Sequence, residues 1–177
     1  MAHANNILIT GYPGVGKTTL VVKVAQRLKH HQPAGFYTRE IRHRGLRVGF
    51  ELVTLEGRRQ ILSHVDIDSR ERVGKYRVDV AALDCFLSST EWSLRPLIII
   101  DEIGKMECLS ARFIELLKQL LDSASVVIAT IARGGAGFIA DTKRRPDCLL
   151  YDVTRTNRDE LAATVTDKAE SLMEELP

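Results

Sequence analysis

The chain has 177 residues, a length that suits one domain and leaves little room for a second hydrophobic core. Hydrophobic residues make up 45% and charged residues 27%, and 25 Lys+Arg against 23 Asp+Glu leave a formal net charge of +2. These values exclude a disordered, collagenous or fibrous protein, and they give no basic surplus that would point to nucleic acid.

The cysteines and the start of the chain indicate the compartment. Cys85, Cys108 and Cys148 form no CxxC pair, and such an odd, widely spaced set favours buried thiols in a reducing compartment over a disulfide scaffold. The first six residues lack the charged and apolar segments of a signal peptide. Apolar runs such as Leu97–Ile100 are too short to span a bilayer. We therefore expect a cytoplasmic protein that does not enter membranes.

The chain opens with a strand, a glycine-rich loop and a helix. Ile7–Thr10 is a short apolar run typical of a strand, and it ends at Gly11. Apolar residues then recur every four positions from Leu20 to Leu28, which predicts an amphipathic helix over Lys17–Lys29. This order predicts a βα unit.

A β-rich stretch follows, with a different texture. Three strand-like runs separated by turns at residues 44–45 and 56–57 predict an antiparallel meander over about residues 35–65. The runs are Gly35–Ile41, Leu46–Thr54 and Arg59–Val65.

The remaining chain alternates apolar runs with helical periodicity, and continuous apolar runs are expected where a strand is buried on both faces of a parallel sheet. The whole pattern predicts one α/β domain over residues 1–177, with a mainly parallel central sheet flanked by helices and the antiparallel meander attached. The remaining expected elements are strands at Val73–Val80, Leu97–Ile100, Val126–Ile131 and Cys148–Val153, and helices at Ala81–Leu87, at Phe113–Leu121 and after an N-cap at Asn157.

The loop after the first strand, residues 11–18, satisfies G-x-x-x-x-G-K-[ST], in the strand-to-helix context that this phosphate-binding motif, the P-loop, requires. The chain is therefore expected to form a single P-loop NTPase domain. Its glycines let backbone N–H groups face phosphate oxygens, and the helix N-terminus adds its positive end. Lys17 is expected to contact the β- and γ-phosphates, and the hydroxyl of Thr18 to bind Mg²⁺. The residues expected to bind phosphate are Gly11, Tyr12, Pro13, Gly14, Val15, Gly16, Lys17, Thr18 and Thr19.

Two carboxylates, Asp101 and Glu102, follow the apolar run at Leu97–Ile100. Because a P-loop NTPase also needs an acid at the end of a neighbouring strand, Asp101 is expected to bind Mg²⁺ directly or through water. Glu102 is expected to orient or deprotonate the attacking water. The alternative is that both residues only cap the strand and start a loop.

Five segments carry a family resemblance: in chain order, GYPGVGKTT, GFYTREIR, IIIDEIGKME, VVIATIA and TNRDEL. Together they resemble the THEP-type nucleoside-triphosphatases, small P-loop proteins, over essentially the whole chain. The resemblance implies a RecA-like α/β fold and Mg²⁺-dependent hydrolysis of ATP, GTP, CTP and UTP to diphosphate and phosphate, with broad base selectivity. It also implies that the segment facing the nucleotide comprises Asp101, Glu102, Ile103, Gly104, Lys105, Met106 and Glu107.

Hydrolysis also requires positive charge at the transition state. Arg133 follows a predicted strand at the place where a ligand crevice is expected, and Arg144 lies in a basic cluster like the lid arginines of small P-loop kinases. A solvated charged face is the alternative for both. Lys105 and Glu107 are compatible with a local ion pair or with nucleotide contact.

Other residues favour structural interpretations. The six arginines between residues 39 and 59 fit the alternating charge of exposed strands, so a nucleic-acid partner is not expected. His30 and His31 are adjacent and are expected to face different sides, so the histidines predict no metal site. Trp92 is expected to pack, and Tyr151 or Phe138 could stack on any base.

Two other functions stay open beside hydrolysis. A small nucleotide or nucleoside kinase would use the same loop with the arginines as a lid, although Glu102 suits a water nucleophile better. A regulatory ATPase would require stimulation by a protein or nucleic-acid partner.

Overall fold

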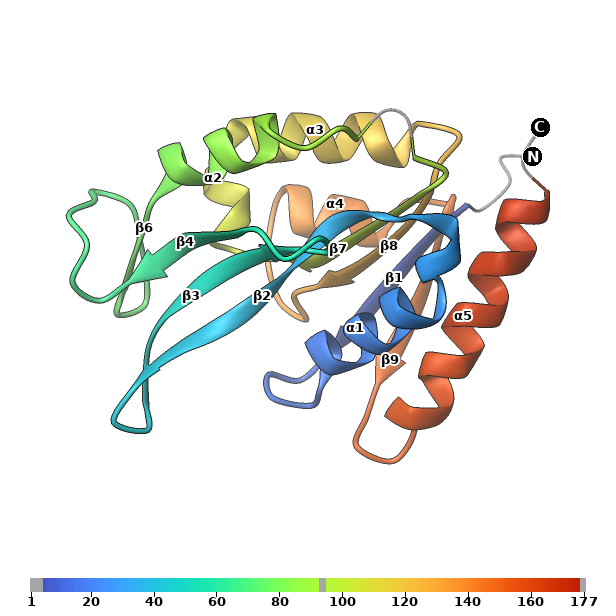
Figure 1. The fold of residues 1–177 in the computed structure, drawn as a ribbon, viewed down its shortest axis with the longest axis horizontal. Helices are drawn as coiled ribbons and strands as arrows, with labels where there is room; N and C mark the ends of the chain where they lie inside the picture. The colour runs from blue at the N-terminus through green and yellow to red at the C-terminus, as the bar shows by residue number, and fades with distance from the viewer. Residues whose placement is uncertain (1–4, 93–94, 176–177) are drawn as a thin grey trace.

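Nine strands form one mixed sheet in the computed structural model, which describes residues 5–92 and 95–175 (Figure 1). The strand order is β5-β6-β4-β3-β2-β7-β8-β1-β9. The strands are β1 (Asn6–Gly11), β2 (Ala34–His43), β3 (Leu46–Thr54), β4 (Arg59–His64), β5 (Arg72–Val73), β6 (Tyr76–Val78), β7 (Leu97–Ile103), β8 (Val126–Ile131) and β9 (Cys148–Val153).

The sheet has a parallel half and an antiparallel half. Strands β2, β7, β8, β1 and β9 are parallel neighbours, whereas β2, β3, β4, β6 and β5 are antiparallel neighbours. The expected mainly parallel sheet is therefore a mixed one. The reason lies in β2, whose first residues, Ala34–Phe36, pair with β7 while the strand continues into the hairpin with β3.

Helices cover both faces of this sheet (Figure 1). Helices α2, α3 and α4 pack on one face, and α1 and α5 pack on the other. Their bounds are α1 (Lys17–Arg27), α2 (Val80–Ser88), α3 (Ala111–Leu121), α4 (Phe138–Lys143) and α5 (Arg158–Glu174), with short 3₁₀ turns η1 (Lys29–His31) and η2 (Glu107–Leu109).

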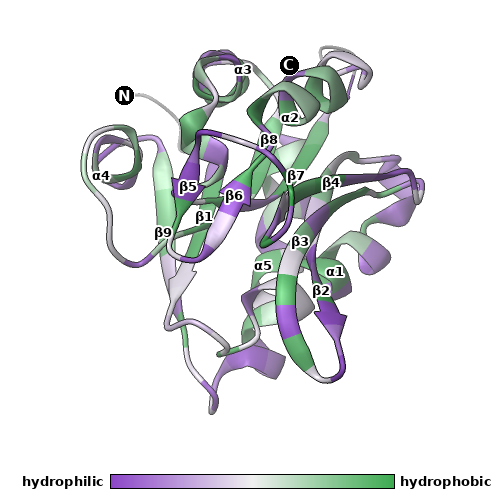
Figure 2. Cartoon of the chain, turned by 90° about the vertical axis from the view of Figure 1, so that its left-hand side faces the viewer, coloured by the Kyte–Doolittle hydropathy of each residue, from purple (hydrophilic) through white to green (hydrophobic). Residues whose placement is uncertain are grey.

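Side chains of the central strands alternate between the two faces of the sheet, so each strand contributes to both hydrophobic cores. In β1, Ile7 and Ile9 pack with α1 and α5, while Leu8 packs with the opposite cluster that contains Phe113 of α3. All of these side chains are fully buried, and each contributes about 1.5–3 kcal/mol through removal from water. Figure 2 shows the apolar residues gathered between the layers, with polar residues toward the tip of the β2–β3 hairpin. The two cores fix the carboxyl ends of the parallel strands.

The structure confirms the expected trace with local differences. The helix predicted over Lys17–Lys29 ends as α1 at Arg27 and continues as η1, and the strand predicted at Val73–Val80 is two short strands before α2. Trp92 packs in the core, as expected. The expectation of buried thiols was wrong: Cys85 is exposed, and Cys108 and Cys148 are only partly buried, although all three thiols are free.

The start of α5 differs from the expectation in one respect. Asn157 occupies the N-cap position of α5, as expected, but its side chain makes no capping hydrogen bond to the helix. It instead accepts a hydrogen bond from the N–H of Thr154 and donates one to the carbonyl of Asp152, which closes the β9–α5 turn.

Within the described residues, none of the helices has the length and apolar content that crossing a membrane would need.

Candidate nucleotide-hydrolysis site

The glycine-rich loop joins β1 to the first turn of α1. Gly14 and Gly16 have φ angles of 74° and 108°, in the left-handed region that side chains rarely adopt. Gly16 occupies the N-cap position and has no side chain to cap the helix, so the first-turn N–H groups stay available to an anion. Lys17 begins α1, and its ammonium donates to the carbonyl of Gly11 at 3.3 Å. The loop can therefore hold a phosphate chain over the helix N-terminus.

Asp101 lies fully buried near the end of β7 and accepts hydrogen bonds from three threonines. Its Oδ2 accepts from the Thr18 hydroxyl at 2.7 Å, and from both the hydroxyl and the N–H of Thr38 at 3.0 and 3.3 Å. Its Oδ1 accepts from the Thr130 hydroxyl at 2.6 Å. These hydrogen bonds replace those to water that a carboxylate loses when it is buried, and they fix the carboxylate of Asp101 beside Thr18.

The Thr18–Asp101 pair fits Mg²⁺. Both side chains offer oxygen atoms, which are the ligands this hard cation prefers, and the two oxygens already converge. Mg²⁺ in such sites usually takes one or two carboxylates, and substrate phosphates and water complete its shell. The arrangement leaves the remaining coordination to substrate and solvent.

Glu102 lies directly after Asp101, and its Oε2 is 3.9 Å from the ammonium of Lys17. Partial burial raises the pKa of the Glu102 carboxyl; the charge of Lys17 opposes this shift, and Asp101 adds to it. About a third of the side chain is exposed, so it can contact water. A carboxylate in this position can accept a proton from a nucleophile.

Glu107 forms a second acidic group behind Glu102. The side chain is buried, and this burial raises its pKa to about 8. Gly104 separates the two glutamates: a Cβ there would lie 2.7 Å from an oxygen of Glu107 and 3.2 Å from one of Glu102. The segment therefore needs glycine at position 104 to bring both carboxyls together.

Tyr12 and Arg133 form one wall of a cavity beside the P-loop, with a volume of about 450 Å³. The guanidinium of Arg133 lies over the Tyr12 ring, 3.9 Å from its centre, and pairs with Asp152 at 3.6 Å. Tyr12 as a whole residue is 64% exposed, which leaves it accessible to a ligand. The cavity is lined by Tyr12, Pro13, Val15, Arg133, Asp152, Val153, Thr154 and Arg155.

Comparison with known proteins identifies the family to which the chain belongs. The model of the NTPase family matches residues 6–166, which is most of the chain and includes both the P-loop and the acidic segment. The chain belongs to this NTPase family. Membership confirms the resemblance carried by the five sequence segments.

Curated relatives and solved structures agree with this placement. The chain is 46% identical over 158 residues to a nucleoside-triphosphatase THEP1 of Thermotoga petrophila, covering 88% of this chain and 87% of the relative. It is 36% identical over 186 residues to the human cancer-related nucleoside-triphosphatase, covering 95% and 98%. The crystal structure of THEP1 from Aquifex aeolicus superposes with a TM-score of 0.81 at 34% identity, covering 93% of this chain and 99% of that one. The Aquifex aeolicus protein therefore shares the fold of this chain at nearly full length.

The other residues of this NTPase that were expected at the site lie in several environments. Val15 is buried in the core with α1 and α5, and Thr19 lies in the first turn of α1. Ile103 is fully buried in the opposite core, and Met106 packs against that core. Lys105 is exposed, and the ion pairs of the described residues do not include one between it and Glu107.

Among the described residues, the ion pair and the side-chain hydrogen bond of Arg144 do not reach the P-loop. Arg144 follows α4, pairs with Asp141, and keeps three quarters of its side chain exposed. The neighbouring Arg145 pairs with Asp147, just before the residue of β9 that pairs with the first residue of β1. Arg145 therefore lies near the end of β1 opposite Gly11, whereas Lys143, from the same basic cluster of residues 143–145, donates a hydrogen bond of 2.6 Å to the carbonyl of Arg133 beside the P-loop.

Sequence reasoning missed two threonines that hold Asp101. Thr130 lies inside the fully buried strand β8, where a lone polar residue among apolar ones could have signalled a buried partner. Thr38 lies within the GFYTREIR segment that carries the family resemblance. The contact of Tyr12 with Arg133 gave no local signal, because the two residues lie far apart in the chain.

Proposed function

We propose that this chain hydrolyses nucleoside triphosphates to diphosphate and phosphate with Mg²⁺, accepting ATP, GTP, CTP and UTP. The observation that carries the proposal is the convergence of Thr18, Asp101, Lys17 and Glu102 at the start of α1. Phosphate-binding amides, a pair of oxygen ligands for Mg²⁺ and a carboxylate base are the parts that water-mediated phosphoryl transfer requires.

Each residue receives one role. Gly11–Thr19 hold the phosphates, with Lys17 on the β- and γ-phosphates, and Thr18 and Asp101 hold Mg²⁺, which neutralises charge on the phosphates when bound. Glu102 orients the attacking water and accepts its proton. Gly104 leaves the space in which the carboxyl groups of Glu102 and Glu107 lie. The insertion of β8 between the P-loop strand β1 and the acid strand β7 supports a RecA-like arrangement.

Broad base selectivity is supported by the Tyr12–Arg133 wall. Every base has a π-face, so stacking on an aromatic ring or a guanidinium binds bases without reading their edges. We propose that the base enters this cavity and that Arg133, rather than Arg144, is the arginine that contacts the nucleotide. Arg133 lines the same cavity as Tyr12, Pro13 and Val15 of the P-loop, which supports this choice.

The test is phosphate release from each of the four triphosphates, with and without Mg²⁺ and without any acceptor. We expect comparable Mg²⁺-dependent release from all four and none from Lys17→Ala, which controls for contaminating phosphatases. Nucleotide binding without release would contradict hydrolysis, and it would direct the search to an acceptor substrate or a stimulating partner. Release from one triphosphate alone would contradict the proposed base tolerance.

A further inference from the structure

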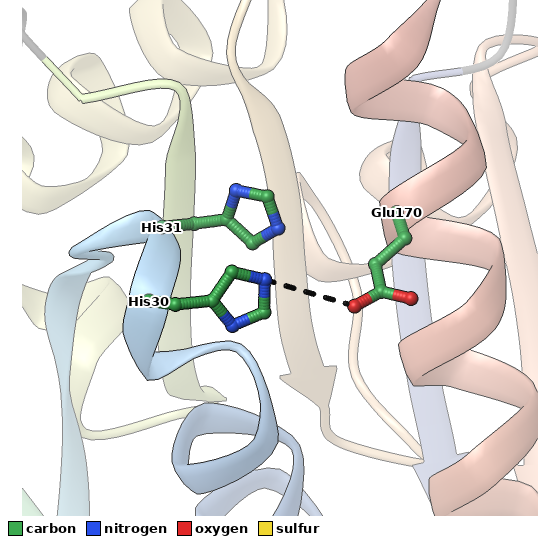
Figure 3. A group of neighbouring side chains, drawn as sticks. All are labelled: His30, His31 and Glu170. Carbon is green, nitrogen blue, oxygen red and sulfur yellow. Dashed lines mark ion pairs between the residues drawn. The ribbon is translucent and has the colours of Figure 1, made fainter.

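Two histidines and a glutamate meet at the end of α1, away from the P-loop. His30 and His31 lie on η1, and both rings point toward Glu170 of α5 (Figure 3). The ring centres are 4.0 Å apart, and Nε2 of His30 is 3.9 Å from Oε1 of Glu170. The sequence predicted that adjacent histidines would face different sides, and this was wrong: both side chains lean to the α5 side of the turn.

The backbone that carries these side chains is anchored in the core. Leu28, just before η1, and Ala169, just before Glu170, are both fully buried in the same hydrophobic cluster. The turn itself is closed by a hydrogen bond of 3.0 Å from the N–H of His31 to the carbonyl of Leu28. The packing of Leu28 and Ala169 holds the backbone of both segments in place. The distances between the imidazole and carboxylate groups can then change by side-chain rotation alone.

Those distances are within reach of a metal ion. One donor atom from each residue lies within 4.8 Å of the other two. Tetrahedral coordination with bonds of about 2.0–2.1 Å places donors about 3.4 Å apart. The donors would therefore close by about 1.4 Å or less, which rotation of partly exposed side chains permits.

The chemistry of the donors selects the type of ion. Two imidazoles and one carboxylate suit Zn²⁺ and neighbouring divalent transition metals, whereas Mg²⁺ prefers an oxygen shell. We propose that His30, His31 and Glu170 form a binding site for a divalent transition metal such as Zn²⁺. The site takes three protein ligands and leaves the remaining coordination to water.

This site is separate from the catalytic machinery. Helix α1 has eleven residues, so its two ends lie about 16 Å apart, with the P-loop at one end and η1 at the other. A bound metal would join the end of α1 to α5, whose packing against each other positions the P-loop helix. We therefore expect Zn²⁺ to stabilise the fold without replacing Mg²⁺ in hydrolysis.

The first test is calorimetric titration of the full chain with ZnCl₂ at pH 8 in excess Mg²⁺, since only unprotonated imidazole binds a metal. We expect one Zn²⁺ per chain, and an affinity lowered at least about tenfold in His30→Ala, His31→Ala and Glu170→Gln. The matched control is His64→Ala, which removes an imidazole 3.7 Å from Asp66 but outside the cluster and should bind as the wild type does. Circular dichroism confirms that each variant is folded.

The second test places the ion. Titration with paramagnetic Ni²⁺ should broaden the amide signals of η1 and of the last two turns of α5, while those of the P-loop stay sharp. The proposal is overturned if the wild type binds no Zn²⁺, or if the histidine variants bind it as tightly as the wild type. Broadening centred on the exposed thiol of Cys85 would also overturn it.

Discussion

The two halves of the sheet carry very different polar chemistry. In the parallel half, the polar groups at the strand ends are buried and converge on Asp101. In the antiparallel half, the charges of β2 and β3 are largely exposed and pair with one another: Arg39 with Glu51, and Glu40 with Arg42 and Arg47. The difference shows that a high density of charged residues does not identify the site. The site is identified by polar side chains that are buried and that converge on one carboxylate.

Thr38 is where the two halves meet. It lies on β2 just beyond the residues that pair with β7, and both its N–H and its hydroxyl donate to Asp101. Two residues further, Glu40 pairs with arginines of the hairpin. The boundary between site and scaffold therefore lies within one strand.

The largest effect is expected when the proposed catalytic base, Glu102, is removed from the parallel half of the sheet. Glu102→Gln should preserve binding of Mg²⁺ and nucleotide but lower turnover at least about 10²-fold, because the amide cannot accept the proton from water. Single-turnover phosphate release, with nucleotide binding measured in parallel, checks this. Normal turnover in the variant would remove Glu102 from the mechanism.

A second test uses the buried carboxyl of Glu107. Its pKa is raised to about 8 from an ordinary value of 4.5, so the folded chain binds a proton that the unfolded chain releases between these values. This contribution to stability is complete below about pH 4.5 and is lost as the pH rises through about 8, at no more than about 1.4 kcal/mol per pH unit.

Glu107→Gln should reduce the fall in the free energy of unfolding as the pH rises, because the amide carries no titrating proton. Urea unfolding at pH 6 and pH 8, without nucleotide or Mg²⁺, measures the difference between the two proteins. An unchanged slope in the variant would mean that another group carries the pH dependence.

A third test concerns the cavity wall. Tyr12→Ala should raise KM about tenfold for all four triphosphates, since one stacking contact contributes about 1–3 kcal/mol. Tyr12→Phe keeps the ring and should behave as the wild type does, and hydrolysis of inorganic triphosphate should not change in either variant. A fall in kcat with unchanged KM would instead place Tyr12 and Arg133 at the transferred phosphate.

The features that could be predicted from the sequence are those that depend on residues close together in the chain. The P-loop needs only a strand, eight residues and a helix, so Lys17 and Thr18 were found from spacing, and the carboxylates after the apolar run at Leu97–Ile100 were found from their position. The contacts of Thr38 and Thr130 with Asp101 depend on the register between β2, β7 and β8, which no local pattern specifies. The meeting of His30 and His31 with Glu170 likewise depends on the packing of α1 against α5.

The smallest effect is expected in the antiparallel half. Glu40→Gln removes the carboxylate that pairs with Arg42 and Arg47, but the pair is exposed, so the free energy of unfolding should change by less than about 1 kcal/mol. Hydrolysis should not change, because the lowered pKa of Glu40 arises from hairpin arginines and not from the site. Thr38→Val, on the same strand, is the contrast: it removes a hydroxyl from a buried carboxylate and should cost about 1.5–3 kcal/mol. Equal effects in the two variants, by urea unfolding and phosphate release, would show that the hairpin contributes to the site beyond Thr38.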